Sequence, residues 1–232
     1  ADPSDGCADP AAAEPGVICT IAGLFGAAKA SEDGLPALES GLYLPIDTTL
    51  GPDGLLYVID WNNHRIRRIE PDGTFVTLAG TGFLGDGPPG PALSASFNHP
   101  TNVKFHPDDD RLMYIAAWHN SRIETLDLDA GVITWECGDG SRAYGGDGGP
   151  AATAQLDLPS AIEFDDDGTL LLSDTANQIL RKVDPSGTIH TLAGTAPLGL
   201  LPGGQTDRRY GWEGDGGDAL DAKFNFGWGQ RG

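Results

Sequence analysis

The feature that most constrains the fold is an internal repeat with a period of 57 residues. Three segments of the chain align without gaps, beginning at residues 56, 113 and 170. Each repeat unit opens at a proline and closes at a glycine that follows Ala or Cys: Pro45 and Gly80, Pro100 and Gly138, Pro159 and Gly194. A fixed period of this length predicts a chain of similar supersecondary units that pack side by side.

Within each unit, the residue pattern predicts four short strands. In the first unit they cover residues 46–50, 55–60, 64–70 and 74–80, which are rich in β-branched and aromatic residues. Hairpin turns such as Pro-Asp-Gly at 52–54 and 71–73 separate them. A helical solenoid would require apolar residues with a 3.6-residue periodicity, and the sequence does not show that pattern. We therefore predict an all-β chain, a β-propeller of four-stranded antiparallel blades, with full blades at about 45–80, 100–138 and 159–194.

The same segments resemble a known repeat. Residues 60–73 read DWNNHRIRRIEPDG, which is very similar to the NHL motif, and the match extends over about residues 16–226. The linker at 144–164, with its GDGGPA core, resembles the blade-to-blade connection of bacterial NHL-repeat proteins. The middle unit departs from the pattern, because Ala117 replaces the Asp of the other two units and Ser121 replaces His64. The resemblance implies an NHL-type propeller, of six blades in the complete ring.

The repeats predict a partial ring, with three full blades and parts of a fourth. Residues 17–23 are expected to form an outer strand without in-blade partners, and FNF at 224–226 matches the FNH before Pro100. Three blades do not close the usual ring of four to eight. We expect residues 1–15 to be an unstructured N-terminal segment and 16–232 to be the partial propeller. Its open blade faces favour self-association.

Charge narrows the set of partners. The chain has 34 acidic and 14 basic residues, a formal net charge of −20, which disfavours nucleic acid and anionic membrane surfaces as partners. No apolar run approaches the length of a membrane span, so membrane insertion is not expected. Cationic partners, divalent metals and simple solubility remain open.

The cysteines do not form a metal or redox motif, since none occurs in a CxxC pair. Cys7 and Cys19 are twelve residues apart and could pair in an oxidising compartment, whereas Cys137 is distant. The chain starts at Ala1 without an apolar leader, so we expect a processed, trimmed or truncated start. The expected location is extracytoplasmic, either secreted or periplasmic.

Strand direction predicts where function lies. In an up-and-down blade, the turn between the second and third strands lies on the same face as the blade-to-blade linkers, and the opposite face carries only tight turns. We call the former the linker face and expect a binding surface there for a protein, peptide or glycan. The candidate binding residues are Asp60, Trp61, Asn62, Trp118, His119, Asn120 and Asp174. Two alternatives remain for the tryptophans, which either contact a partner or pack beneath the linker. The repeated Asn63, Asn120 and Asn177 are expected to cap backbone amides and to tolerate a left-handed conformation.

The acidic glycine-rich loops invite a calcium site, because they carry Asp33, Asp86, Asp147 and Asp215. Calcium prefers six to eight oxygen ligands from several carboxylates, and one aspartate per loop falls short of that number. We therefore assign no cofactor and no metal ligand, with calcium as the open alternative.

The competing functional class is a metal-dependent propeller enzyme. The resemblance implies this alternative because related propellers include a peptidyl-hydroxyglycine lyase and calcium-dependent lactonases, whose sites surround the central channel. The matching places here are Asp47, Asn102 and Ala161, which would hold a channel-axis divalent ion, but Ala161 offers no ligand atom. The five histidines occupy different places in the repeat, and no catalytic motif is present, so no catalytic residue is assigned.

Overall fold

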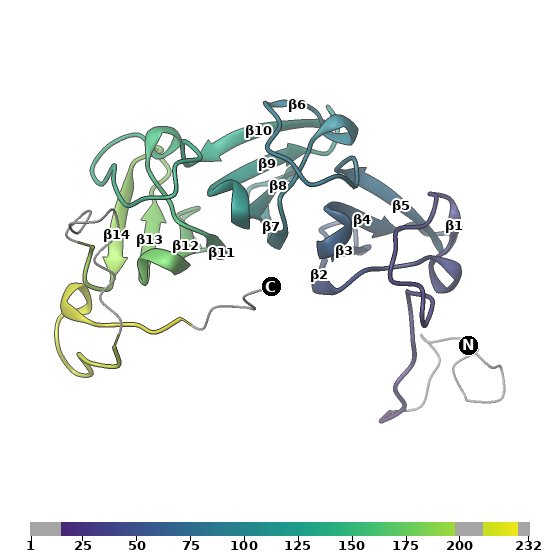
Figure 1. The fold of residues 1–232 in the computed structure, drawn as a ribbon, viewed down its shortest axis with the longest axis horizontal. Helices are drawn as coiled ribbons and strands as arrows, with labels where there is room; N and C mark the ends of the chain where they lie inside the picture. Colours follow the sequence, from purple (N-terminus) through teal and green to yellow (C-terminus); the bar gives the residue numbers. More distant parts are fainter. Residues whose placement is uncertain (1–14, 198–210, 227–232) are drawn as a thin grey trace.

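A computed structural model describes residues 15–197 and 211–226 and shows three antiparallel sheets that follow one another along an arc (Figure 1). The first blade contains β2 (Pro45–Leu50), β3 (Leu56–Asp60), β4 (Arg65–Ile69) and β5 (Thr74–Ala79). The second contains β7 (Pro100–His106), β8 (Asp109–Ala117), β9 (Arg122–Asp127) and β10 (Val132–Cys137). The third contains β11 (Pro159–Phe164), β12 (Leu170–Asp174), β13 (Ile179–Val183) and β14 (Ile189–Ala193). The predicted all-β class with four-stranded antiparallel blades is confirmed.

The linkers add a fifth strand to the outer edge of the blade that follows them. β1 (Leu35–Pro36) pairs with β5, and β6 (Gly90–Pro91) pairs with β10. In the third blade, Pro150 makes the equivalent bridge to Thr188. The pairing covers the backbone edge that an outer strand would otherwise leave open. Each linker therefore runs along the outside of the next blade before it enters that blade's inner strand.

A repeated hydrogen bond fastens each blade to the next linker. The glycine after each outer strand donates its N–H to the first residue of a short 3₁₀ turn: Gly80 to η4 (Ala92–Ser94), Gly138 to η6 (Ala151–Thr153) and Gly194 to η8 (Ala219–Asp221). These glycines have φ near +100°, where a side chain is strained, and a Cβ on Gly80 would collide with the carbonyl oxygen of His64. This explains why the glycine recurs in every unit.

The core lies between neighbouring blades. Tyr57 of the first blade packs edge-on against Phe105 of the second, with ring centroids 4.9 Å apart. Tyr114 makes the same contact with Phe164 of the third blade, also at 4.9 Å. Leu171 occupies the equivalent place in β12 and lines an open groove formed by residues of the second and third blades instead. Self-association through this open face stays a prediction.

One expected strand is not formed. Residues 17–23 contain no strand. The N–H groups of Gly23 and Leu24 instead bond to the linker carbonyls of Ala37 and Ser40. Residues 224–226 also lack a strand, and the Phe226 N–H donates to Gln178 Oε1 at 2.7 Å.

Residues 1–14 of the predicted unstructured segment 1–15, including Cys7, lie outside the described residues. Cys19 is disulfide-bonded, and Cys137 is a buried free thiol. Among the described residues, no helix is long and apolar enough to cross a membrane.

Candidate functional site

The turn between the second and third strands of each blade is a short 3₁₀ helix. These turns are η3 (Trp61–Asn63), η5 (Trp118–Asn120) and η7 (Thr175–Asn177). Each ends at a residue in the left-handed region: His64 (φ 52°), Ser121 (φ 53°) and Gln178 (φ 59°). The left-handed residue is therefore the one after the repeated Asn, not the Asn itself, which corrects that part of the sequence prediction.

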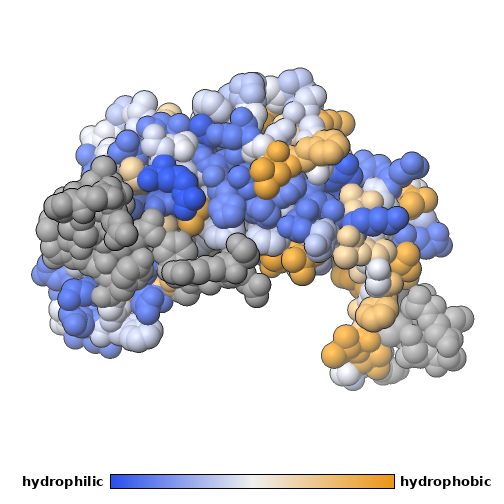
Figure 2. Space-filling view, in the orientation of Figure 1, coloured by the Kyte–Doolittle hydropathy of each residue, from blue (hydrophilic) through white to orange (hydrophobic). Residues whose placement is uncertain are grey.

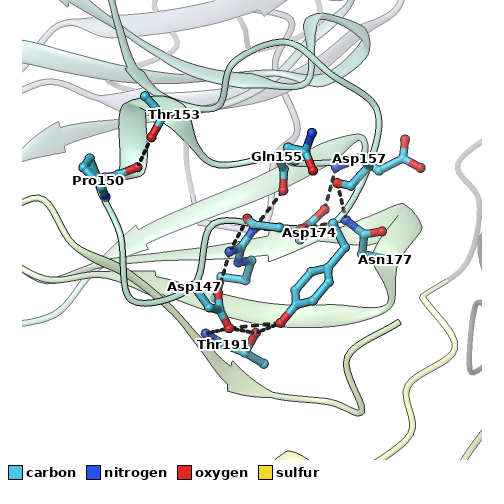
Figure 3. Close-up of polar contacts among 12 residues, drawn as sticks. Asp147, Pro150, Thr153, Gln155, Asp157, Asp174, Asn177 and Thr191 are labelled. Atoms are coloured by element: carbon cyan, nitrogen blue, oxygen red, sulfur yellow. Dashed lines mark hydrogen bonds and ion pairs between the residues drawn. The ribbon is translucent and has the colours of Figure 1, made fainter. Parts of the chain in front are cut away.

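The aspartates at the strand ends hold these turns against the linker. Asp60 Oδ1 accepts the backbone N–H of Tyr43 at 2.8 Å, and Asp174 Oδ1 accepts that of Asp157 at 2.8 Å. The Asn177 amide donates to the remaining Asp174 oxygen at 2.9 Å (Figure 3). Asp60 and Asp174 are both 0% exposed. Their expected contact with a partner is corrected, because buried carboxylates position the turn and do not reach its surface.

The second blade shows why Ala117 is tolerated where the other blades have Asp. There, Asn120 Oδ1 itself accepts the backbone N–H of Asn98 at 2.7 Å. The Asn120 amide donates to the Gly85 carbonyl at 2.9 Å and to Asp86 Oδ1 at 3.1 Å. Asn120 thus makes the hydrogen bond to the linker that the aspartate makes in the other two blades. Asn120 is also buried, so it is not available to contact a partner.

Buried arginines neutralise the acidic glycine-rich loops. Arg181 is fully buried and donates to the carbonyl oxygens of Gln155 (2.9 Å) and Gly145 (3.0 Å) and to Asp147 Oδ1 (2.5 Å). Burial acts to raise the pKa of Asp147, but the hydrogen bonds from Thr191 and Arg181 lower it below the ordinary value. Arg67 pairs in the same way with Asp33 at 3.3 Å.

In the second blade, Arg122 pairs with Asp86. Calcium at Asp33, Asp86 or Asp147 would have to displace an arginine from each carboxylate. Among residues 15–197 and 211–226, no group of three His, Cys, Asp or Glu side chains gathers in a way that could hold a metal ion.

The buried arginine on the third strand of the first and third blades is replaced by Glu124 in the second blade. Glu124 occupies the place in β9 that Arg67 has in β4 and Arg181 has in β13, so the second blade has a buried acid where the others have a buried base. Burial raises the pKa of Glu124 to about 8, while Arg122 opposes the rise and Asp86 adds to it. The sequence alignment shows the swap, but only the structure shows that the carboxyl is buried.

An aromatic–histidine cluster, which comprises Trp61, His64, His99, Trp118 and His119, lies where the first two blades meet on the linker face. His99 contacts Trp61 and His64, with ring centroids at 4.4 and 4.6 Å, and Trp118 stacks on His119 at 3.9 Å. Burial lowers the pKa of His64 and of His119 to about 4 and also lowers that of His99. All three imidazoles are therefore neutral at physiological pH.

Of the seven predicted binding residues, Trp61, Asn62, Trp118 and His119 keep half-buried side chains. Trp61 packs against the core between the first and second blades, and its ring lies 6.3 Å from that of Trp118. Both tryptophans therefore combine a packing role with a remaining accessible edge.

Sequence reasoning missed a recurring aromatic residue three positions before a linker aspartate: Phe83, Tyr144 and Trp212. Phe83 is 78% exposed and Trp212 is 83% exposed, while the Tyr144 hydroxyl donates to Asp147 at 3.0 Å. Leu84, beside Phe83, is 59% exposed. Figure 2 shows apolar patches of this kind interrupting a largely hydrophilic surface along the arc. The shared offset from the aspartate could have revealed these residues.

The channel positions of the enzymatic alternative form an inter-blade clasp. Asn102 donates to Asp47 Oδ2 at 2.7 Å and accepts the Ile162 N–H at 2.9 Å, so it links the inner strands of all three blades. Ala161 adds no polar side chain. Asp47 and Asn102 are thus the two of these three positions with donor atoms, and their contacts serve cohesion between the blades.

Comparison with known proteins shows which family this chain belongs to. The family model described as "Teneurin NHL domain" matches residues 15–201. Teneurin-1 of Gallus gallus is 31% identical over 174 residues, which covers 70% of this chain and 6% of that protein. The NHL repeat-containing protein 2 of Gallus gallus is 33% identical over 81 residues, covering 34% of this chain and 11% of that protein.

Among solved structures, a protein of unknown function from Bacteroides thetaiotaomicron superposes with a TM-score of 0.55 at 19% identity. The match covers 77% of this chain and 40% of that one, and it supports the fold alone. The chain spans a small part of the teneurins that it matches. Since the two relatives named above are animal proteins, the bacterial type implied by the GDGGPA linker stays a prediction.

Proposed function

Since the chain belongs to the Teneurin NHL domain family, we propose that its linker face is a non-enzymatic binding surface for a protein or peptide. Of the three partner classes expected from the sequence, a glycan fits least well. Phe83 and Leu84, two exposed side chains of the first-to-second linker, offer no hydrogen bonds to sugar hydroxyls.

The observation that carries the proposal is an exposed apolar pair on a loop that is held in place. The Gly85 carbonyl accepts the Asn120 amide at 2.9 Å, and the Gly85 N–H donates to the Phe97 carbonyl at 3.2 Å. Phe83 and Leu84 directly precede this anchored glycine and are nonetheless 78% and 59% exposed. Apolar groups presented in a fixed conformation lose little entropy on binding, which favours a contact surface.

Charge supports a neutral or basic partner, because the chain carries a formal net charge of −20. The disulfide bond of Cys19 supports an oxidising, extracytoplasmic location, since such bonds persist mainly in secreted and periplasmic proteins. We therefore extend the proposal to a secreted or periplasmic domain.

The test is selection of peptides from a display library on the folded chain, followed by affinity measurements with variants. We expect Phe83→Ala/Leu84→Ala to weaken a selected peptide by at least about tenfold, a loss of roughly 1.4 kcal/mol. Leu50→Ala is the matched control, because Leu50 is 68% exposed at the opposite end of the first blade, and it should leave affinity unchanged. An equal loss in both variants, or a failure to select any peptide, would contradict the proposal.

A further inference from the structure

Three side-chain atoms that can each offer a lone pair, one amide oxygen and two imidazole nitrogens, converge at the junction of the first and second blades. His99 Nδ1 lies 2.9 Å from Asn98 Oδ1 and 3.2 Å from His119 Nδ1, and His119 Nδ1 lies 3.2 Å from Asn98 Oδ1. The three atoms thus form a nearly equilateral triangle, so a single point lies close to all of them.

The size of this triangle matches one face of a metal coordination shell. Ligands at about 2.0–2.1 Å from one ion are separated by about 2.9 Å at a right angle and by about 3.4 Å at the tetrahedral angle. The observed separations of 2.9 and 3.2 Å fall between these limits. We propose that Asn98, His99 and His119 bind one divalent transition-metal ion of the zinc type.

The second nitrogen of His99 supports this assignment. His99 Nε2 lies 3.2 Å from Asn62 Oδ1, and donation of an N–H there leaves Nδ1 as a lone pair. In this tautomer the Nδ1 lone pair lies 2.9 Å from the Asn98 carbonyl oxygen, so both atoms offer electron pairs to a bound ion, whereas the other tautomer makes an ordinary hydrogen bond there. An outer hydrogen bond that orients a ligating histidine is usual in metal sites.

The surroundings fix both rings. His99 holds a left-handed backbone (φ 60°), and its N–H donates to His64 Nδ1 at 3.3 Å. The His119 ring stacks on Trp118 at a centroid distance of 3.9 Å. Asn98, His99 and His119 are only half-buried, which leaves room for water or a further ligand on the ion.

Donor chemistry and sequence set the metal class and the stoichiometry. Imidazole nitrogen favours zinc, copper or nickel over calcium and magnesium, which prefer all-oxygen shells. The positions equivalent to His99 are Leu44 and Leu158, and those equivalent to His119 are Asn62 and Ala176. Because the histidine pair occurs in the second blade alone of the three, we expect one ion per chain. The site does not depend on the proposed protein partner.

The experiment is calorimetric titration of the tag-free full chain with zinc chloride. We expect one zinc ion per wild-type chain and no binding of calcium chloride. His119→Phe keeps the stack on Trp118 but removes the ligand, and it should weaken zinc binding by at least about tenfold. His190→Phe removes a half-exposed histidine of β14 and should leave zinc affinity unchanged.

Circular dichroism checks that each variant is folded, and Asn98→Ala replaces His119→Phe if the latter does not fold. Zinc affinity that is unchanged by loss of the ligand, absence of zinc binding by the wild-type chain, or calcium binding of equal strength would each overturn the proposal.

Discussion

Replacement of Glu124 by Gln tests the effect of a buried acid at the position where the other two blades have a buried arginine. Burial raises the pKa of Glu124 from 4.5 to about 8 in the folded chain. A carboxyl whose pKa is higher in the folded state favours folding only while it is protonated, so the stability is fully present below pH 4.5 and is lost as the pH rises toward 8. At pH 7 the unfolded chain ionises this carboxyl, while the folded chain keeps it protonated. One pKa unit corresponds to about 1.4 kcal/mol, so the wild type loses on the order of 3 kcal/mol of folding stability at pH 7. Glutamine has nearly the same shape and no charge to bury, so this cost disappears in Glu124→Gln.

The assay is urea unfolding followed by tryptophan fluorescence at pH 5 and at pH 8. We expect the stability advantage of Glu124→Gln over the wild type to grow by roughly 4 kcal/mol between these pH values. Glu39→Gln, at an exposed site in η2 (Ala37–Glu39), is the control and should show no such growth. If the stability curves of Glu124→Gln and wild type run parallel across this range, the reasoning about a buried, protonated Glu124 is refuted.

Three further predictions test the arginine network, the glycine anchor and the free thiol. Arg181→Met removes the cationic partner of Asp147 and the donors to two linker carbonyls, so it should lower the free energy of unfolding by about 3–5 kcal/mol. The exposed Arg111→Met should leave the urea midpoint unchanged, and similar midpoints for the two variants would contradict this prediction. Gly80→Ala should lower the thermal midpoint, because φ is +99° and the added Cβ would collide with the carbonyl of His64. Gly90→Ala should leave the midpoint unchanged, because its Cβ would meet no atom within 4 Å. Equal midpoints for the two variants would contradict this prediction. Burial raises the pKa of the Cys137 thiol to about 12, so Ellman's reagent should react with it only after unfolding, and rapid reaction of the native chain would refute its burial.

The network around Asp174 illustrates why part of the candidate site could not be predicted from the sequence. The alignment shows that Asp60 and Asp174 recur and that Ala117 breaks the pattern. It does not show that each aspartate accepts an amide from the linker 17 residues earlier, or that Asn120 takes over this bond in the second blade. Such a polar residue at a strand end looks the same in sequence whether it faces solvent or a buried amide.

The sequence by itself determined the family, the all-β class and the four strands of each blade. The strands depend on local signals, namely the alternation of apolar residues and the Pro-Asp-Gly turns, which act within a few residues of one another. The recurrence of these signals every 57 residues indicates the blades. The NHL resemblance is confirmed by the family match, because the same local motif carries both.

Only the tertiary structure decided what the side chains do. The linker folds back along the outer edge of the next blade, and this return brings Asp147 to Arg181, which is 34 residues away, and His99 to His119, which is 20 residues away. Residues 17–23, expected to be a strand, form none. Burial and pairing are set by which segments meet in space, so the recurrence of a residue in the repeat does not by itself show whether it is buried or which residue it contacts.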